Sequence, residues 1–407
     1  MKTVEGTGPA ELAFRQRDGD VPLPSDPSQL KVALATAFPQ DPKRPRGGVE
    51  AVSVNLARAL AGLPSLQIHV VTLDRDCSSG AVSEWEGATI HRLPATGGPL
   101  LLNAKGCYRR LVQQYVSQLK PDVVHAHDTY GIMVKGLNVP RVFTVHGFIH
   151  EDTLYAGGRF AWLRSKLWKR IEISAWADQP HIISISPYVR ERLRGIAKGV
   201  VHDIENPIAA ECFAVRHDEQ PGAIFCAAGV CERKNTLGLV RAFAFLSREN
   251  PAARLRWAGP VVDAGYERNV RQSIEEHGLT GKVTLLGPVS SEQIRAELAK
   301  AAVFALVSFE EGAPMGVAEA MAAGVPVVTS NRCGMPYMVR DGENGFLVDP
   351  NDPAGIAGRI GEILGDKTLR ASMGKRSAEV ALDLFHPAPV AMRTYAVYRQ
   401  AFKKGKN

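Results

Sequence analysis

Two glutamates, Glu311 and Glu319, stand eight positions apart in a stretch whose glycines and proline predict a loop that opens a helix. A carboxylate accepts two parallel hydrogen bonds, so each glutamate can bind a pair of neighbouring hydroxyl groups. If Gly316 opens the helix, Glu319 lies in its first turn, and the N–H groups around Met315 and Gly316 point at an anion. This order of groups matches the sugar, diphosphate and ribose of a nucleotide-activated sugar. Solvated surface charges are the alternative, which the flanking apolar runs disfavour.

Paired glycines, Gly47 and Gly48, follow the first expected strand and precede an expected helix. Such a pair lets the backbone approach a phosphate closely and leaves N–H groups free to bind it. A tight turn also needs glycines and is the alternative. The position directly after the first strand favours phosphate binding.

A similar arrangement recurs in the second half, where a strand ends at Gly229 and the cations Arg233 and Lys234 precede a helix. Fixed cations would stabilise the charge that develops on a departing diphosphate, and no metal would be required. A solvated basic turn is the alternative.

Histidines end two expected strands of the first half: His125 and His127, followed by Asp128, and then His146 and His150. The first two point the same way on a strand, as metal-ligand pairs do, so a metal-hydrolase site is one interpretation. Such hydrolases use a barrel of strands, which the expected fold is not. We expect His125 in the core, whereas His127 either orients an acceptor or caps its strand.

Residues 159–170 contain five Arg or Lys and no acid. On a helix, four apolar residues form one stripe, which we expect to lie in the core: Phe160, Leu163, Leu167 and Ile171. The cations Arg159, Lys166, Lys169 and Arg170 gather on the other side around Trp162. Because this run of charges is short, we expect a solvated helix face. Contact with an anionic lipid surface or a lipid-phosphate acceptor is the alternative.

The length of 407 residues predicts two domains, and the hydrophobic content of 45% is typical of a globular α/β protein. The net charge of +7 permits an anionic ligand or membrane surface without indicating nucleic acid. Six dispersed cysteines, without CxxC spacing, predict free thiols in a reducing cytoplasm. We expect neither a membrane span nor a signal peptide.

Strand-like and helical stretches alternate along the chain, which predicts parallel sheets built from βαβ units. The expected strands are 31–36, 68–73, 123–125, 142–145, 182–184, 200–204, 223–228, 255–258, 283–286, 303–307 and 325–329. The expected helices are 49–62, 107–119, 158–175, 188–195, 236–247, 264–278, 290–301, 316–323, 356–364, 367–384 and 387–404. Two doubly wound domains would place a ligand cleft between the carboxyl ends of their sheets.

The expected division has a loose tail at 1–29, a first domain at 30–207, a linker at 208–221 and a second domain at 222–386. The linker is assigned because the stretch from Pro207 to Pro221 is polar and bounded by prolines.

The run from Phe309 to Ser330 resembles the signature of the retaining glycosyltransferases of family 4, whose glutamate pair falls on Glu311 and Glu319. The resemblance extends from near Lys31 to the last expected helix. It implies the GT-B architecture, in which two Rossmann-like domains face each other and the C-terminal helix, here 387–404, crosses back to the first domain. It also implies polysaccharide biosynthesis in the cytoplasm.

The resemblance implies roles for individual residues. Glu311 would hold hydroxyl groups of the donor sugar, Glu319 would hold the ribose, and His146 would lie near the anomeric carbon. Donor binding would involve the loop residues Gly47, Gly48, Gly229, Met315 and Gly316, while Arg233 and Lys234 would stabilise the leaving group. His127 and Asp128 are acceptor-side candidates. The chain departs from the family at Val230, where an arginine is expected, so either Arg233 has taken over or the leaving group is less stabilised.

The residues and the resemblance together predict a retaining, metal-independent glycosyltransferase that needs no cofactor. Its donor would be a nucleoside diphosphate sugar, its acceptor a saccharide or a lipid-linked glycan, and nucleic acid is not an expected partner. Two alternatives remain open. A sugar-nucleotide epimerase would turn the donor over without an acceptor, and Val230 leaves room for a degenerate transferase that only binds nucleotide sugars.

Overall fold

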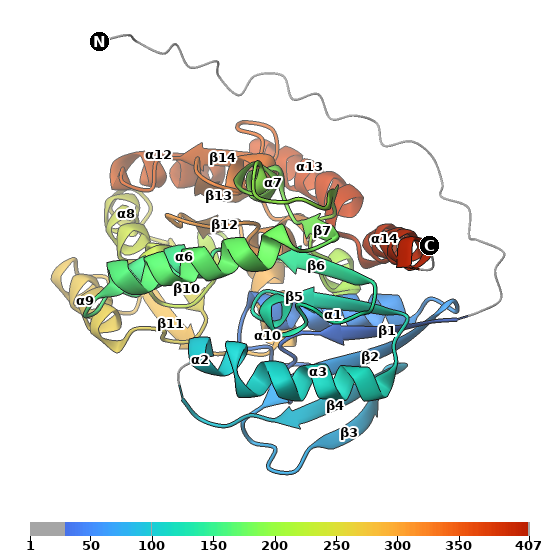
Figure 1. The fold of residues 1–407 in the computed structure, drawn as a ribbon. Coiled ribbons are helices and arrows are strands. Elements are labelled where there is room, and N and C mark those ends of the chain that lie inside the picture. Colours follow the sequence, from blue (N-terminus) through green and yellow to red (C-terminus); the bar gives the residue numbers. More distant parts are fainter. Residues whose placement is uncertain (1–28, 99, 406–407) are drawn as a thin grey trace, which may run out of the picture.

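The computed structural model describes residues 29–98 and 100–405, and the chain forms two sheets with helices packed on both faces of each (Figure 1). The expected α/β class with two doubly wound sheets is confirmed. The tail predicted for residues 1–29 lies, except for its last residue, outside the described residues. The predicted domain boundaries stay a prediction, although the last strand of the first sheet ends at Asp203 and the second sheet begins at Ala223.

The first sheet has the order β3-β4-β2-β1-β5-β6-β7-β8, and every neighbouring pair is parallel except β3 with β4. Its strands are β1 Leu30–Ala35, β2 Leu66–Asp74, β3 Ala81–Trp85, β4 Ala88–Pro94, β5 Val123–His127, β6 Arg141–Val145, β7 His181–Ser184 and β8 Val200–Asp203. The order reverses between β1 and β5, and such a point opens a crevice at the carboxyl ends of the strands.

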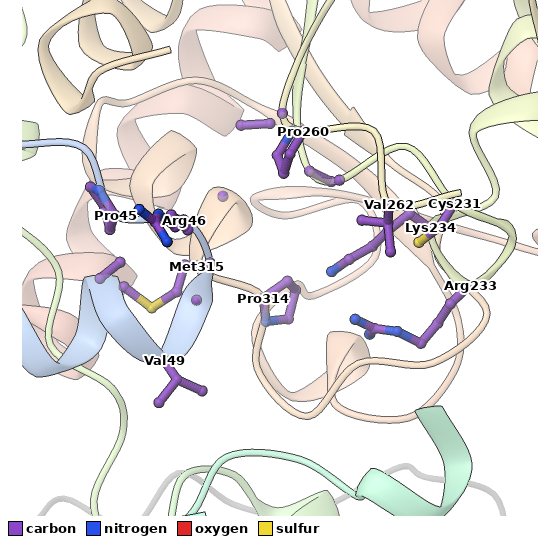
Figure 2. A pocket seen from close by; sticks show the side chains of 18 of the residues that line it. Pro45, Arg46, Val49, Cys231, Arg233, Lys234, Pro260, Val262, Pro314 and Met315 are labelled. Atoms are coloured by element: carbon purple, nitrogen blue, oxygen red, sulfur yellow. The ribbon is translucent and has the colours of Figure 1, made fainter. Parts of the chain in front are cut away.

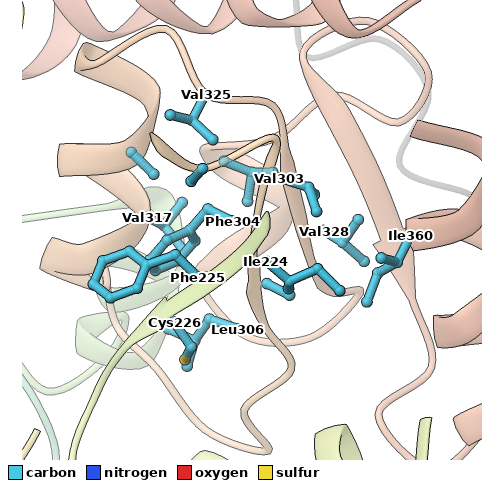
Figure 3. Close-up of a cluster of buried hydrophobic side chains, with 14 of the residues drawn as sticks. Ile224, Phe225, Cys226, Val303, Phe304, Leu306, Val317, Val325, Val328 and Ile360 are labelled. Atoms are coloured by element: carbon cyan, nitrogen blue, oxygen red, sulfur yellow. The ribbon is translucent and has the colours of Figure 1, made fainter. Parts of the chain in front are cut away.

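The second sheet has the order β11-β10-β9-β12-β13-β14 and is parallel throughout. Its strands are β9 Ala223–Ala227, β10 Arg254–Ala258, β11 Val283–Gly287, β12 Val303–Leu306, β13 Val327–Ser330 and β14 Gly345–Val348. This is the strand order of a dinucleotide-binding fold, with its reversal between β9 and β12. Figure 3 shows that Phe225 and Phe304, from these two central strands, lie in the buried core beside Val317.

Helices connect the strands and cover both sheets. In the first half they are α1 Gly48–Ala61, α2 Leu100–Lys105, α3 Cys107–Leu119, α4 Tyr130–Met133, α5 Ile149–Tyr155, α6 Ala161–Ala177 and α7 Pro187–Leu193. In the second half they are α8 Thr236–Glu249, α9 Ala264–Glu276, α10 Ser291–Lys300, α11 Met315–Ala322, α12 Pro353–Gly365, α13 Lys367–Phe385 and α14 Pro387–Gly405. Short 3₁₀ turns occupy Ala210–Ala214, Glu232–Lys234 and Met335–Tyr337. Within the residues described, no helix is both long and apolar enough to cross a membrane.

Helix α14 follows the second sheet in sequence but packs on the first, beside α1 (Figure 1). Its apolar side chains share one core cluster with residues of β1 and β2, and Tyr398 is completely buried there. The hydroxyl group of Tyr398 lies 2.7 Å from Nδ1 of His125 on β5. The expected return of the last helix to the first domain is therefore present.

The prediction that an apolar stripe on helix 158–175 lies in the core was wrong for three of the four residues of that stripe. Phe160, Leu163 and Leu167 are exposed, and only Ile171 is buried. The reason is the buried carboxylate of Glu172, which accepts hydrogen bonds from the backbone N–H groups of Ile149 and His150 at the start of α5. That anchor fixes the rotation of α6 and turns the stripe outward.

Several elements were not expected from the sequence. The antiparallel pair β3–β4 turns at Glu86 and Gly87, which both have positive φ and suit a two-residue hairpin loop. The short helices α2, α4 and α5 and the strand β14 were also missed. Each spans no more than seven residues, which is too short for a clear periodic pattern.

Replacing Tyr398 by phenylalanine should remove the hydrogen bond to His125 and leave a buried ring nitrogen without it. We expect the free energy of unfolding to fall by about 1–3 kcal/mol, measured by urea denaturation. Tyr337→Phe, at an exposed site, is the matched control. Equal stability of Tyr398→Phe and wild type would contradict a structural role for this contact.

Candidate active site

A cleft of about 1500 Å³ lies between the two sheets and is lined by loops of both halves. Figure 2 shows Arg46 and Val49 on one side, Arg233 and Lys234 on the other, and Pro314 between them. Most of the residues predicted from the sequence line this cleft: Gly47, Gly48, Asp128, His146, Gly229, Arg233, Lys234, Glu311, Met315, Gly316 and Glu319. Their individual roles stay predictions.

The carboxylate of Glu311 is almost fully buried in the wall of the cleft and is paired with two cations. The ammonium group of Lys234 contacts Oε1 of Glu311 directly, and Nη1 of Arg233 lies 3.4 Å from the same oxygen. Burial alone would raise the pKa of Glu311, but Lys234 and Arg233 together hold that pKa below its usual value. Glu311 is therefore an ionised group that the protein fixes in position.

Arg233 connects the two halves of the molecule. Its Nη1 donates a hydrogen bond of 2.8 Å to the carbonyl oxygen of Glu310, and its Nε lies 3.1 Å from Oδ1 of Asp152 on α5. Burial opposes the charge of Arg233, but the carboxylates of Glu311 and Asp152 outweigh it and raise the pKa of the guanidinium. Asp152 was missed from the sequence because its partner comes from the other half of the chain.

Further contacts between the halves lie beside this arginine. The hydroxyl group of Tyr188 donates a hydrogen bond of 2.7 Å to Oε1 of Glu310, and Ser186 donates one of 2.8 Å to the carbonyl oxygen of Gly312. The glutamate loop is thus held against the start of α7 as well as against α5.

Glu319 lies in the second turn of α11 and not in its first, because the helix begins at Met315, one residue earlier than expected. Its side chain forms no hydrogen bond or ion pair with another described residue. Burial raises the pKa of Glu319 to about 7, although Arg295 opposes the shift. Gly316 is required by close packing, since a Cβ there would lie 2.7 Å from the carbonyl oxygen of Ala227.

The glycine pair at the start of α1 has a different explanation. A Cβ on Gly47 would meet no atom within 4 Å, and one on Gly48 would only touch Met315 at 3.8 Å. Protein packing therefore does not require either glycine. No side chain caps this helix, so its first N–H groups face the open cleft, where an anion would be favoured.

The histidines lie in two layers. His146 lines the cleft, and burial lowers its pKa to about 4 while Asn206 opposes the shift. His127 lies behind it, with the two ring centroids 4.6 Å apart and with Nδ1 of His127 3.1 Å from the hydroxyl oxygen of Thr36. His127 is thus buried and separate from the cleft lining, whereas His125 lies deeper in the core, as expected.

Asp128 follows His127 with a positive φ of 43° and lines the cleft. Its Oδ1 accepts a hydrogen bond of 3.2 Å from the backbone N–H of His146. Burial raises the pKa of Asp128 to about 7 despite this bond. In the part of the chain that the structure covers, no group of three His, Cys, Asp or Glu side chains could hold a metal ion.

Two family models match consecutive parts of the chain. "Glycosyltransferase Family 4" matches residues 46–211, and "Glycosyl transferases group 1" matches residues 209–380. The match of the second model contains the glutamate pair and the two cations that contact Glu311.

Curated relatives align mainly over part of the chain. A D-inositol 3-phosphate glycosyltransferase of Streptomyces scabiei is 34% identical over 34% of this chain and 33% of its own length. An O-antigen chain mannosyltransferase B of Escherichia coli is 37% identical over 34% of this chain and 35% of its own. The chain thus aligns with about a third of the length of each of these two relatives.

Solved structures match nearly the whole fold. A sucrose-phosphate synthase of Thermosynechococcus elongatus has a TM-score of 0.77 at 22% identity, covering 92% of this chain and 100% of its own. The HepE protein of Anabaena, in complex with UDP-glucose, has a TM-score of 0.70 at 16% identity, covering 91% and 100%. At this identity they show the fold alone, and the GT-B architecture predicted for the chain is confirmed.

The buried histidines predict a pH dependence of stability. Burial holds the pKa of His127 well below 6.5 in the folded chain, with His146 and His125 adding to the effect. The unfolded chain therefore takes up a proton below about pH 6.5 that the folded chain excludes, and stability is lost as the pH falls. His127→Gln should reduce the loss of unfolding free energy between pH 6 and pH 5 by up to about 1.4 kcal/mol per pH unit. Urea denaturation at several pH values measures it, and an unchanged slope would contradict the prediction.

Proposed function

Because the chain belongs to the group 1, family 4 glycosyltransferases, we propose that it moves a sugar from a nucleoside diphosphate sugar to a saccharide or lipid-linked acceptor, with retention of the anomeric configuration. The bond between the anomeric carbon and the terminal phosphate oxygen breaks, and its electron pair stays on the phosphate. The acceptor hydroxyl oxygen bonds to the anomeric carbon on the same face, and its proton passes to the phosphate. We expect the reaction to need no metal.

The main support for this proposal is the arrangement of two carboxylates along one wall of a single cleft. Glu311 lies in the loop before α11 and Glu319 in the second turn of that helix, while the uncapped start of α1 faces them across the cleft. A nucleotide sugar would place its sugar hydroxyls at Glu311 and its ribose at Glu319. Its diphosphate would then meet the N–H groups of Gly48 and its neighbours.

Arg233 and Lys234 would stabilise the departing diphosphate, in place of the arginine that the family pattern has where this chain has Val230. The side chain of Val230 is buried in the core of the second half and supplies no charge to the cleft. Both cations are already held in the cleft wall by Glu311. Fixed positive groups of this kind stabilise developing charge without reorganising during the reaction.

The other side of the cleft would receive the acceptor and position the reacting carbon. His146 lines it and has a pKa of about 4, so the ring is neutral near pH 7 and can bond a sugar hydroxyl. Asp128 holds the backbone beside this ring. Neither residue is assigned as a nucleophile, since transfer on the front face needs none.

An epimerase and a degenerate binding protein remain the alternatives. An epimerase would convert the donor without an acceptor. A binding protein would hold the donor tightly and transfer nothing to any acceptor pool, which the missing arginine at position 230 favours.

A thermal-shift panel of nucleoside diphosphate sugars tests the proposed donor class. A donor that binds only the folded chain should raise the melting temperature increasingly with its concentration. The free nucleoside diphosphate should also stabilise the protein, and the corresponding nucleoside should do so less because it lacks the phosphates. No shift with any nucleotide sugar at millimolar concentration would contradict the proposal.

Glu311→Ala should abolish transfer, with a loss of at least about 100-fold in kcat, because the donor sugar loses its fixed acceptor and Lys234 loses its partner. Glu311→Gln keeps the shape and removes the charge, so it should remain severely impaired, and its melting temperature should be measured alongside because Arg233 and Lys234 lose their carboxylate partner. Glu275→Ala, at an exposed site on α9, is the matched control. Full activity of Glu311→Ala in a sugar-transfer assay would refute the site.

A further inference from the structure

The outward face of α6 combines large apolar and basic side chains. Trp162, Leu163 and Leu167 are 57%, 53% and 46% exposed, and Phe160, immediately before the helix, is 58% exposed. Lys166, Lys169 and Arg170, which were expected on the other side of the helix from the leucines, are exposed on the same half. At 100° per residue, these helical positions share one half of the helix, while Ser165, Glu172 and Trp176 share the buried half.

The structure itself fixes this orientation. Glu172 accepts hydrogen bonds from the backbone of Ile149 and His150 and from the ring of His150, and it is buried at 4% exposure. Rotating α6 to bury Leu163 and Leu167 would pull this carboxylate away from all three donors. The exposure of the apolar side chains is therefore a property of the folded chain.

The basic residues of this face form no ion pair with an acidic side chain in the described part of the chain. Residues 159–170 contain no Asp or Glu, and among the described residues no carboxylate forms an ion pair with Lys166, Lys169 or Arg170. The ammonium group of Lys166 instead lies 4.9 Å from the ring centroid of Trp162, and Arg159 stacks similarly on Phe160. Unpaired cations beside aromatic and aliphatic side chains are typical of interfacial helices on anionic membranes.

This face lies close to the cleft. Tyr155 and Ala156, at the end of α5, line the cleft, and only Gly157 to Phe160 separate them from α6. Gly157, Gly158 and Phe160 all have positive φ, so the chain turns sharply there. Figure 1 shows α6, in green, drawn across the front of the molecule, and this helix packs against α5 and α4.

We propose that the outward face of α6 docks on an anionic lipid surface, with Trp162, Leu163 and Leu167 entering the headgroup region and the cations binding lipid phosphates. Other occupants fit less well. Nucleic acid offers nothing for exposed leucines, and a second copy of the chain would bring two like-charged faces together. Docking places the mouth of the cleft at the bilayer, so an acceptor carried by lipid can reach it; this last step rests on the proposed function.

Co-sedimentation of the full chain with vesicles tests the docking. The wild type should sediment with vesicles that contain equal amounts of phosphatidylcholine and phosphatidylglycerol, less so at high salt, and should stay in solution with phosphatidylcholine alone. The variant Lys166→Glu, Lys169→Glu, Arg170→Glu should bind the anionic vesicles at least about tenfold more weakly. The variant Trp162→Ser, Leu163→Ser, Leu167→Ser should weaken binding comparably, and both variants should melt as the wild type does.

The matched control reverses the charge of three exposed lysines that lie elsewhere on the protein, and it should retain most of the vesicle binding: Lys300→Glu, Lys375→Glu and Lys404→Glu. Equal loss in this control would show attraction by net charge alone and overturn the proposal. The proposal would also be overturned if the wild type stayed in solution in the presence of anionic vesicles. If the wild type instead self-associates and the serine variant does not, the face is an interface between copies of the chain, which likewise overturns the proposal. No donor is present in this assay, so its failure leaves the transfer activity untouched, and a negative donor panel leaves the docking untouched.

Discussion

The contact between Glu311 and the two cations is the interaction on which the geometry of the cleft depends. A carboxylate in this almost fully buried position would be neutral without partners, and two cations without a carboxylate would repel each other. Together they give an ionised oxygen pair and two fixed positive charges within a few ångströms. The site therefore has its charges in place before any ligand arrives, which is the condition for electrostatic stabilisation at little reorganisation cost.

The same contact joins the two halves of the chain. Arg233 belongs to the second half, yet its guanidinium reaches Asp152 in the first, beside the bonds from Tyr188 and Ser186 to the glutamate loop. A ligand that attracts Arg233 competes with Asp152 for it. Binding of a diphosphate is thus expected to change the balance of contacts across the interface, so that occupancy of the cleft and the relative position of the halves are linked.

Much of the fold could be predicted from the sequence because parallel strands and their helices leave strong periodic patterns. The expected helix 107–119 has the observed bounds of α3, and each expected strand overlaps an observed one. The glutamate pair could be placed at a helix start because glycine and proline mark the loop before it. Periodicity shows that a helix has an apolar side but not whether another element packs on that side, so the exposure of Leu163 and Leu167 was missed. The hydrogen bonds of Glu172 decide which side of α6 faces the protein. Likewise, no local signal pairs Asp152 with Arg233, because their contact exists only after the halves have met.

The position of α14 bears on how the chain reaches its native state during synthesis. The ribosome completes every strand of both sheets before it makes Tyr398 and the apolar residues around it. Until then, the first sheet has an open apolar surface where α14 will pack. The N-terminal half cannot finish folding ahead of the C-terminal half, as consecutive domains usually do. A nascent chain of this kind therefore exposes an apolar surface until its last helix has been made.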